Sequence, residues 1–431
     1  MTKKAYTIFN AILLIIGAIF IYELLRDSMR PGDFIGYVDA GNLVLADKDI
    51  YSDIHNTWPP LFSVFSVILS IGDNLSPFFI RFLWLLGSIV SIYFITSLSV
   101  HMVFNKPLTI RGNSNGIQIQ DPLIVVPLLI MLRFILDNLA SVQINIYMVL
   151  CSLLSIVFFI KKKYIWVGLL LGLTISLKVY TVFFLFYFLY KREFKPVAWT
   201  ILFLLIFNSI PFVVFGFDQS MEYYHHWIGE VVPLSYKAEF RNQSVFGAFL
   251  RYFTTSDPTQ NMYVNFLDIQ AHTIKLVTYG MIFAASMLPI YLFRKKIKDR
   301  RAIRSLLEYS VIFTIIPIFS PVAWKAFFIF LWVPYFLLYL VLYRFEFKLT
   351  KKVLTRIRGL FWLSVVLNVF STELFVGYYL SDLLEAYSVV TIGTVILLII
   401  QIFVAGKAGK IHLAPENFRT GPRTPFSFLG K

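Results

Sequence analysis

Residues 161–192 read KKKYIWVGLLLGLTISLKVYTVFFLFYFLYKR and decide the class of fold. Between Lys163 and Lys191 lie 27 residues, and Lys178 is the only charged one among them. Lys and Arg collect on the cytoplasmic side of membranes, so both basic ends should lie on that side. A helical span needs about 20 apolar residues, and 27 residues are too few for two full spans with a turn. The stretch therefore predicts two short helices that meet at membrane depth near Lys178.

The rest of the chain has the same apolar character. Of 431 residues, 58% are hydrophobic, 18% aromatic and only 15% charged. Such a composition excludes a soluble protein and predicts an all-α integral membrane protein with about 10 to 12 membrane helices. Besides the hairpin around Lys178, we expect spans near residues 5–25, 77–100, 122–138, 141–160, 196–216, 268–293, 305–319, 326–343, 359–380 and 386–404.

The net charge of +15 reflects topology. Seven segments contain 28 of the 39 Lys and Arg residues: Lys3–Lys4, Lys106–Arg111, Lys161–Lys163, Lys191–Lys195, Arg294–Arg304, Arg344–Arg358 and the tail after residue 404. The loops that lie between these segments contain few Lys and Arg residues, so the seven basic segments mark the cytoplasmic side. The pattern predicts membrane lipids as neighbours and no nucleic-acid partner.

This topology sets the domain organisation. We expect a single polytopic membrane domain over residues 1–404, with two long external loops at 26–76 and 217–265, and a cytoplasmic basic tail at 405–431. Both termini would be cytoplasmic. The first apolar run is long and lacks a small-residue cleavage site, which favours a retained span over a signal peptide.

Few residues suggest metal or disulfide chemistry. The single cysteine, Cys151, excludes a disulfide framework and a Cys-based zinc site. His225 and His226 are adjacent, and neighbouring residues on a helix point in different directions. We therefore predict no metal and no cofactor.

The first external loop contains the most informative polar residues. Asp33 follows the first span by a few residues, near the membrane surface where the head group of a lipid-linked substrate would sit. Further on, Trp58 precedes Pro59 and Pro60 and an apolar run that ends at Gly72. This order suits an interfacial aromatic anchor followed by a helix start, because proline is tolerated in a helix's first turn.

A series of short motifs extends over most of the chain, from about residue 30 to residue 330: Asp33-Phe34 with Tyr37, Ile50-Tyr51, Trp58-Pro-Pro-Leu-Phe62, Gln143-Ile-Asn145, Leu177-Lys178-Val-Tyr180, Asn242-Gln243-Ser244 with Gly247, and Ser320-Pro-Val-Ala-Trp324. In this order they resemble glycosyltransferase family 87, the polyprenyl-phosphate-mannose-dependent mannosyltransferases with the GT-C fold. The resemblance implies transfer of a sugar, mannose in that family, from a polyprenyl-phosphate donor to a lipid or glycan acceptor of the cell envelope. The reaction would take place on the external face of a bacterial plasma membrane.

The resemblance also implies roles for single residues. Asp33 matches the aspartate taken in the family as the general base, and Asp39 is the alternative. Tyr37 and Trp58 belong to the same motifs and would contact substrate. One carboxylate can suffice for an inverting displacement, because a phosphate leaving group departs without the general acid that a glycosidase requires.

Cations or oriented donors should meet the leaving phosphate. Lys178 is the leading candidate, since an unpaired ammonium in apolar surroundings is costly; alternatively, it pairs with Asp137 for structural reasons. Arg241 offers a second cation, or is a surface residue at the interface. Asn242 and Gln243 would bind sugar hydroxyls or tie down the second loop.

The sequence departs from the family after Trp324. Many relatives have an acidic residue and one or two histidines there, whereas this chain has Lys325, Ala326 and Phe327. Lys325 could itself bind phosphate. Two other classes of protein fit the composition: a polytopic transporter or flippase of lipid-linked sugars, and a scaffold for envelope polysaccharide assembly. Against a transporter, the chain has no second copy of the hairpin around Lys178, as related halves would require.

Overall fold

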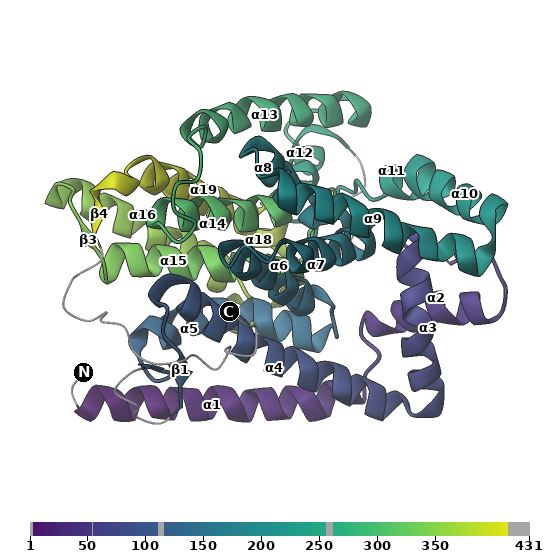
Figure 1. Ribbon diagram of the computed structural model, residues 1–431, viewed down its shortest axis with the longest axis horizontal. Helices are drawn as coiled ribbons and strands as arrows, with labels where there is room; N and C mark the ends of the chain where they lie inside the picture. The colour runs from purple at the N-terminus through teal and green to yellow at the C-terminus, as the bar shows by residue number, and fades with distance from the viewer. Residues whose placement is uncertain (1–2, 54, 111–115, 256–261, 413–431) are drawn as a thin grey trace.

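The chain folds as an all-α polytopic membrane protein, as predicted (Figure 1). The computed structural model describes residues 3–53, 55–110, 116–255 and 262–412, so the predicted basic tail lies outside the described residues beyond His412. Within the described ranges the only strands are two-residue pairs. β1 (Leu108–Thr109) pairs in parallel with β2 (Ile117–Gln118), and β3 (Glu346–Phe347) pairs antiparallel with β4 (Ile411–His412).

Seven helical segments of the described chain are long and apolar enough to cross a membrane. They are α1 (Lys3–Ser28), α4 (Pro77–Phe104), α5 (Pro122–Ala140), α9 (Phe194–Phe215), α13 (Ala271–Leu292), the continuous pair η3 (Lys325–Leu331) and α15 (Trp332–Tyr343), and α19 (Val389–Gly406). The sequence predicted 10 to 12 membrane segments because it also counted helices that are shorter or more charged.

The remaining helices are shorter, more polar or both. They are α2 (Phe34–Leu45), α3 (Pro60–Leu75), α6 (Asn145–Ile160), α7 (Tyr164–Leu177), η1 (Val179–Thr181), α8 (Val182–Tyr190), α10 (Phe217–His226), the π-helix η2 (Trp227–Val231), α11 (Val232–Leu234), α12 (Val245–Phe253), α14 (Ile303–Phe319), α16 (Lys351–Val369), α17 (Glu373–Val376), α18 (Tyr378–Ala386) and η4 (Ala408–Lys410). The predicted first external loop thus contains two helices, α2 and α3. The predicted span at 359–380 ends early, at Val369.

The hairpin around Lys178 forms as the sequence predicts. α7 ends at Leu177, and Lys178 itself has extended backbone, with φ −145° and ψ 106°. The chain then continues through η1 into α8. A lysine in the middle of an apolar run thus marks the break between two short helices.

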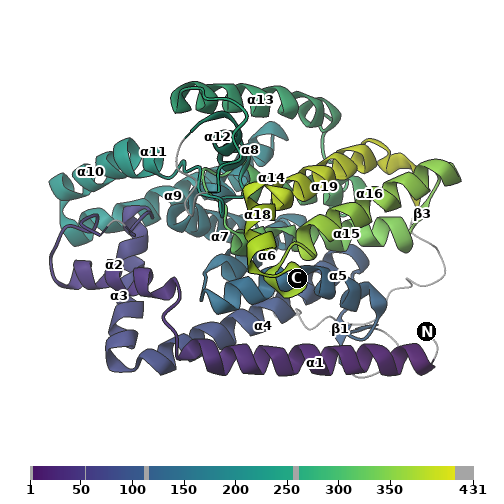
Figure 2. The same cartoon turned by 180° about the vertical axis from the view of Figure 1, so that it is seen from behind.

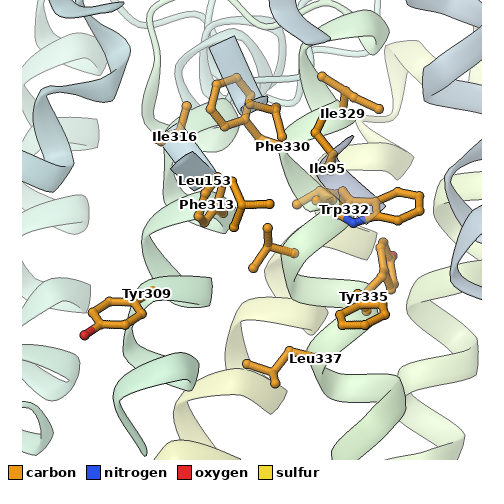
Figure 3. Packing of buried hydrophobic residues seen from close by; sticks show 14 of the residues in the cluster. Ile95, Leu153, Tyr309, Phe313, Ile316, Ile329, Phe330, Trp332, Tyr335 and Leu337 are labelled. Carbon is orange, nitrogen blue, oxygen red and sulfur yellow. The ribbon is translucent and has the colours of Figure 1, made fainter. Parts of the chain in front are cut away.

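α15 lies at the centre of the molecule. In an apolar 18-residue window of the segment Lys325–Tyr343, 89% of the residues are buried, compared with 11% in the corresponding window of α13. Figure 3 shows Trp332, Tyr335 and Leu337 of α15 among side chains of α14, including Phe313 and Ile316. The apolar residues of α13 are largely exposed and suit contact with lipid.

The two ends of the molecule differ in sequence character. α1 runs from the end where β3 and β4 lie to the end where α2, α3 and α10 lie (Figures 1 and 2). Helices of both predicted external loops therefore gather at the end opposite the basic segment that begins at Arg344. This separation agrees with the partition of charge in the sequence.

Candidate active site

The segment Pro31-Gly32-Asp33 follows α1 in sequence and contacts the turn between α5 and α6. The Asp33 N–H donates to the Ser141 carbonyl oxygen at 2.9 Å. Gly32 has a φ of +50°, and a Cβ at this position would lie 2.9 Å from the Ser141 backbone. Conformation and space both require glycine here. Gly32 thereby fixes the position of Asp33.

The Asp33 side chain faces Gln143. Asp33 is the N-cap residue of α2, yet its carboxylate caps no N–H of that helix and instead accepts a hydrogen bond from Gln143 Nε2. Tyr37, one turn into α2, donates its O–H to Gln143 Oε1 at 3.1 Å. The Asp33 side chain is half-buried, so its carboxylate keeps accessible lone pairs.

Lys178 belongs to the same group of side chains. Its Nζ donates to Asn145 Oδ1 at 3.1 Å, and Asn145 Nδ2 donates to Gln143 Oε1 at 3.4 Å. The Lys178 charge acts on the Asp33 carboxylate. Since an ammonium has three donors, Lys178 can hold an anion while it remains bonded to Asn145. Residues from the first loop, the α5–α6 turn and the break after α7 thus meet at one place.

Asp137 takes no part in this group. The charged residues that act on it are Lys325, Arg133 and Glu373. Lys178 therefore has Asn145 as its hydrogen-bond partner in place of Asp137, the structural partner considered from the sequence. A cation held by a neutral amide keeps its charge available for a substrate phosphate.

The α5–α6 turn that presents Gln143 is strained and firmly held. Val142 is fully buried and has a φ of +51°, a conformation that costs a β-branched residue about 1–3 kcal/mol. Asn138, in the last turn of α5, accepts from the Gln143 N–H at 2.9 Å and donates its side-chain N–H to the Ala326 carbonyl at 2.6 Å. Such strain persists only where surrounding contacts impose it, and it accumulates at functional sites.

Burial and two contacts act in opposite directions on the pKa of the Asp33 carboxyl. Burial raises the pKa of the Asp33 carboxyl above its ordinary value, because a charged carboxylate loses hydration. The Gln143 hydrogen bond and the Lys178 charge lower that pKa in part. A carboxylate with a raised pKa is a stronger base than an exposed one and suits the removal of a proton from a hydroxyl group.

Aromatic side chains of α2, α3 and the segment before α3 pack on one another close to Asp33 in sequence. Trp58 stacks on Phe62 with ring centroids 4.6 Å apart and packs edge-on against Tyr37 at 5.0 Å. Tyr37 and Phe62 are fully buried, whereas Trp58 is half-buried. α3 begins at Pro60, where the sequence predicts a helix start. Tyr37 is thus linked to Asp33 through Gln143, and Trp58 packs against Tyr37 and its contact Phe62.

Asp39 faces a different environment. Six residues separate it from Asp33, and the charged groups that act on it are Asp53, His55 and Asp73. None of these belongs to the group around Gln143. The placement favours Asp33 over Asp39 as the reactive carboxylate.

The segment Asn242-Gln243-Ser244 is tied into the protein by its backbone surroundings. Asn242 Nδ2 donates to the carbonyls of Lys237 and Pro321, and its Oδ1 accepts from the N–H groups of Ser244 and Ala323. Gln243 Nε2 donates to the carbonyls of Phe240 and Glu385. Both side chains are fully buried. These contacts fit the alternative in which the two amides tie down the second loop.

Arg241 precedes this segment and is exposed. Its guanidinium lies over the ring of Phe240, with 5.4 Å between the guanidinium carbon and the ring centroid. The structure therefore places Arg241 on the surface, outside the hydrogen-bonded group around Gln143.

Lys325 begins η3 and forms an ion pair. Its Nζ lies 2.7 Å from Glu385 Oε1, and Arg133 lies 3.7 Å from the same oxygen. The Lys325 side chain is 24% exposed. Phe327, two residues on, packs against Tyr180 with ring centroids 4.9 Å apart, so η3 is adjacent to the segment that follows Lys178.

The described residues contain no group of three or more His, Cys, Asp or Glu side chains that could hold a metal ion. His225 and His226 lie at the end of α10, and His226 Nδ1 is 3.5 Å from Glu230. The absence of a metal site remains a prediction for the chain as a whole.

The sequence predicts site roles for Asp33 and Lys178 but none for Gly32, Gln143, Asn145 or Glu385. The Pro31-Gly32 pair before Asp33 is a turn signal that points to special backbone geometry. Gln143 and Asn145 stand as two amides between apolar runs, which marks them as polar groups that need partners. No local signal links Glu385 to Lys325.

Fold and site together define a membrane-embedded protein that presents a half-buried carboxylate and a nearby cation from different segments. The sequence model of glycosyltransferase family 87 matches residues 56–321. The chain belongs to this family and is a membrane glycosyltransferase. The matched region includes Gln143, Asn145 and Lys178 and begins after Asp33. No curated protein and no solved structure matches the chain.

Proposed function

We propose that this glycosyltransferase moves a hexose, mannose in the first instance, from a polyprenyl-phosphate carrier to a lipid or glycan acceptor of the cell envelope. The proposed reaction is an inverting displacement on the external face of a bacterial plasma membrane. The proposed architecture is a GT-C-like bundle. The observation that supports the proposal most is the chain of side chains that joins Asp33 to Lys178 through Gln143 and Asn145.

The chemistry needs one base and one cation. The acceptor hydroxyl forms a new bond to the anomeric carbon while the bond from that carbon to the phosphate oxygen breaks. The phosphate leaves with the bonding electrons, and the hydroxyl proton passes to the Asp33 carboxylate. Lys178 stabilises the negative charge on the departing phosphate. No general acid is required, because a phosphate ester oxygen is a good leaving group.

The other predicted residues have supporting roles in this proposal. Tyr37 and Trp58 shape the wall beside the sugar. Lys325, held by Glu385, and the exposed Arg241 attract the anionic head group or acceptor at longer range. Asn242 and Gln243 hold the second loop in place.

An assay of the purified protein in lipid tests the proposal. The protein is supplied with radiolabelled polyprenyl-phosphate mannose and a lipid extract as acceptor source, and the products are separated. We expect label to move from the carrier to a new product, and the Asp33→Asn variant to leave the label on the carrier. Movement of intact labelled carrier across sealed proteoliposomes, with no new product from either protein, would instead indicate a flippase.

Labelling with a membrane-impermeant thiol reagent tests the external location of the site. A cysteine introduced at Ser52, in the first loop, should react when the reagent is added outside intact cells. A cysteine introduced at Lys348, beside β3, should react only after the cells are permeabilised. The reverse pattern would place the reaction on the cytoplasmic face.

A further inference from the structure

Two amides connect the proposed base to the proposed phosphate-binding cation. Gln143 Nε2 donates to Asp33, Gln143 Oε1 accepts from Asn145 Nδ2, and Asn145 Oδ1 accepts from Lys178 Nζ. The Tyr37 hydroxyl adds a second donor to Gln143 Oε1. The chain spans three segments that are far apart in sequence. Among the described residues, this is the series of hydrogen bonds that links a carboxylate to an ammonium at this site.

The two ends of this chain fix the orientation of both amides. An ionised carboxylate only accepts hydrogen bonds, so Gln143 must turn its Nε2 toward Asp33 and its Oε1 toward Asn145. An ammonium only donates, so Asn145 must turn its Oδ1 toward Lys178 and its Nδ2 toward Gln143. The two requirements agree with each other, and Tyr37 reinforces the orientation of Gln143. Each amide is therefore locked without help from a substrate.

We propose that Gln143 and Asn145 are positioning residues that hold the Asp33 base and the Lys178 cation as one preorganised unit, with Gln143 keeping the base ionised. This inference rests on the proposed function of the same site. Preorganised groups need no rearrangement during the reaction, which is a large part of enzymatic rate enhancement. In such a unit the protonation state of Asp33 depends on Gln143, an uncharged residue that can be substituted while Asp33 is kept.

The surroundings of Asp33 make this dependence measurable. The groups that act on its carboxylate are Gln143 from the α5–α6 turn and Lys178 from the break after α7, and Tyr37 on α2 is the neighbouring titratable hydroxyl. Gln143 favours the ionised form of Asp33 by donating a hydrogen bond. Loss of that donor should therefore raise the pKa of the base, and a like charge in its place should raise the pKa further.

Gln143→Glu is the sharpest test. It keeps the side-chain length, removes the N–H donor and adds a carboxylate beside Asp33, and two adjacent carboxylates cannot both ionise readily. A base works only above its pKa, so the rate is retained at high pH and lost as the pH falls through that value. We expect the acidic limb of kcat/KM against pH to move upward by about one unit or more. Gln143→Met, which removes the donor without adding charge, should move it in the same direction by less.

Gln120→Glu is the matched control. Gln120 also donates one hydrogen bond from Nε2, to the Ile110 carbonyl, and is buried, whereas Gln143 is half-buried. It precedes α5, whereas Gln143 follows it, and 19 helical residues separate the two ends by about 28 Å. The control should leave the acidic limb in place. A purely structural role of Gln143 would lower the yield of folded protein without moving the pH profile.

The outcomes separate this inference from the proposed function. An unshifted acidic limb in folded Gln143→Glu and Gln143→Met, with Asp33→Asn still inactive, overturns the positioning role and leaves the reaction intact. Full turnover by Asp33→Asn overturns the proposed base itself. For Asn145, the Asn145→Asp variant should bind polyprenyl phosphate about tenfold more weakly, because the new carboxylate competes for Lys178. Unchanged binding would remove Asn145 from the unit.

Discussion

The segment around Asp33 and the segment Asn242-Gln243-Ser244 both lie in long loops, and both are bonded to distant parts of the chain. Their partners differ. Asp33 is bonded through its side chain to another side chain, and that series ends on the ammonium of Lys178. Asn242 and Gln243 donate their side-chain N–H groups to backbone carbonyls. The first arrangement leaves charged groups at its ends for a substrate, whereas every side-chain donor of the second is bonded to backbone within the protein.

The largest expected effect is at the first segment. Asp33→Asn keeps the shape and a hydrogen-bonding side chain but cannot accept the proton of the acceptor, so turnover should fall by about 10² to 10⁴. Donor binding should persist, because Lys178 is unchanged. Turnover with radiolabelled donor and equilibrium binding of the donor measure the two effects separately.

Asp39→Asn is the control for this change. Asp39 responds to Asp53, His55 and Asp73 and should alter turnover little. Near-normal transfer by Asp33→Asn together with inactive Asp39→Asn would move the base to Asp39, inside α2.

The next largest effect should come from Lys178→Gln, which removes a charge at nearly constant volume. A hydrogen bond to a charged group contributes about 1.5–3 kcal/mol, so the dissociation constant for polyprenyl phosphate should rise about ten- to hundredfold. Lys275→Gln in α13, where the ammonium is half-buried over the Tyr236 ring and donates to the Pro233 carbonyl, is the matched control and should bind normally. Equal affinity in both variants would return Lys178 to a structural role.

Asn242→Ala should separate the two segments most clearly. It removes the side chain that bonds two backbone carbonyls and two backbone N–H groups, although the Pro321 carbonyl keeps the Ser244 hydroxyl, and the expected loss in the free energy of unfolding is about 1–3 kcal/mol. Thermal denaturation in detergent measures this loss. The turnover of the molecules that remain folded should be unchanged. A large drop in donor affinity at normal stability would show that the second segment also binds substrate.

The smallest effect should come from Arg241→Ala. The guanidinium is exposed and screened by solvent, so it should contribute only weak, salt-dependent attraction for an anionic head group. We expect donor affinity to fall by about twofold at low salt and to match that of the unmodified protein at high salt. A loss as large as that of Lys178→Gln would make the two segments equal partners in binding.

Much of the fold follows from local sequence. The 27 residues between the basic flanks are too few for two full spans, so the stretch must contain two short helices. Lys178, the charged residue in its middle, marks the break between them. Pro60 marks the start of α3 because its ring fits only the first turn of a helix. Both features depend on neighbours in the sequence, and both are confirmed.

The contacts within the site do not follow from local sequence. Gln143 and Asp33 are 110 positions apart, and nothing near either residue identifies the other as its partner. The same holds for Lys325 and Glu385, which come together only because η3 packs near α18. The resemblance placed Asp33 and Lys178 in one site, and only the packed helices reveal the amides between them.

The hydrogen bond from Asn138 to Ala326 has a consequence for the order of synthesis. It joins residues 188 positions apart, and a ribosome adds about 5–20 residues per second. The turn that presents Gln143 is therefore without this support for about 10 to 40 seconds after it enters the membrane. A nascent chain halted before Ala326 already contains Asp33, Gln143 and Lys178. It lacks the Ala326 carbonyl that supports the α5–α6 turn, in which Gln143 lies. Activity should thus arise late in translation, when η3 inserts beside α5.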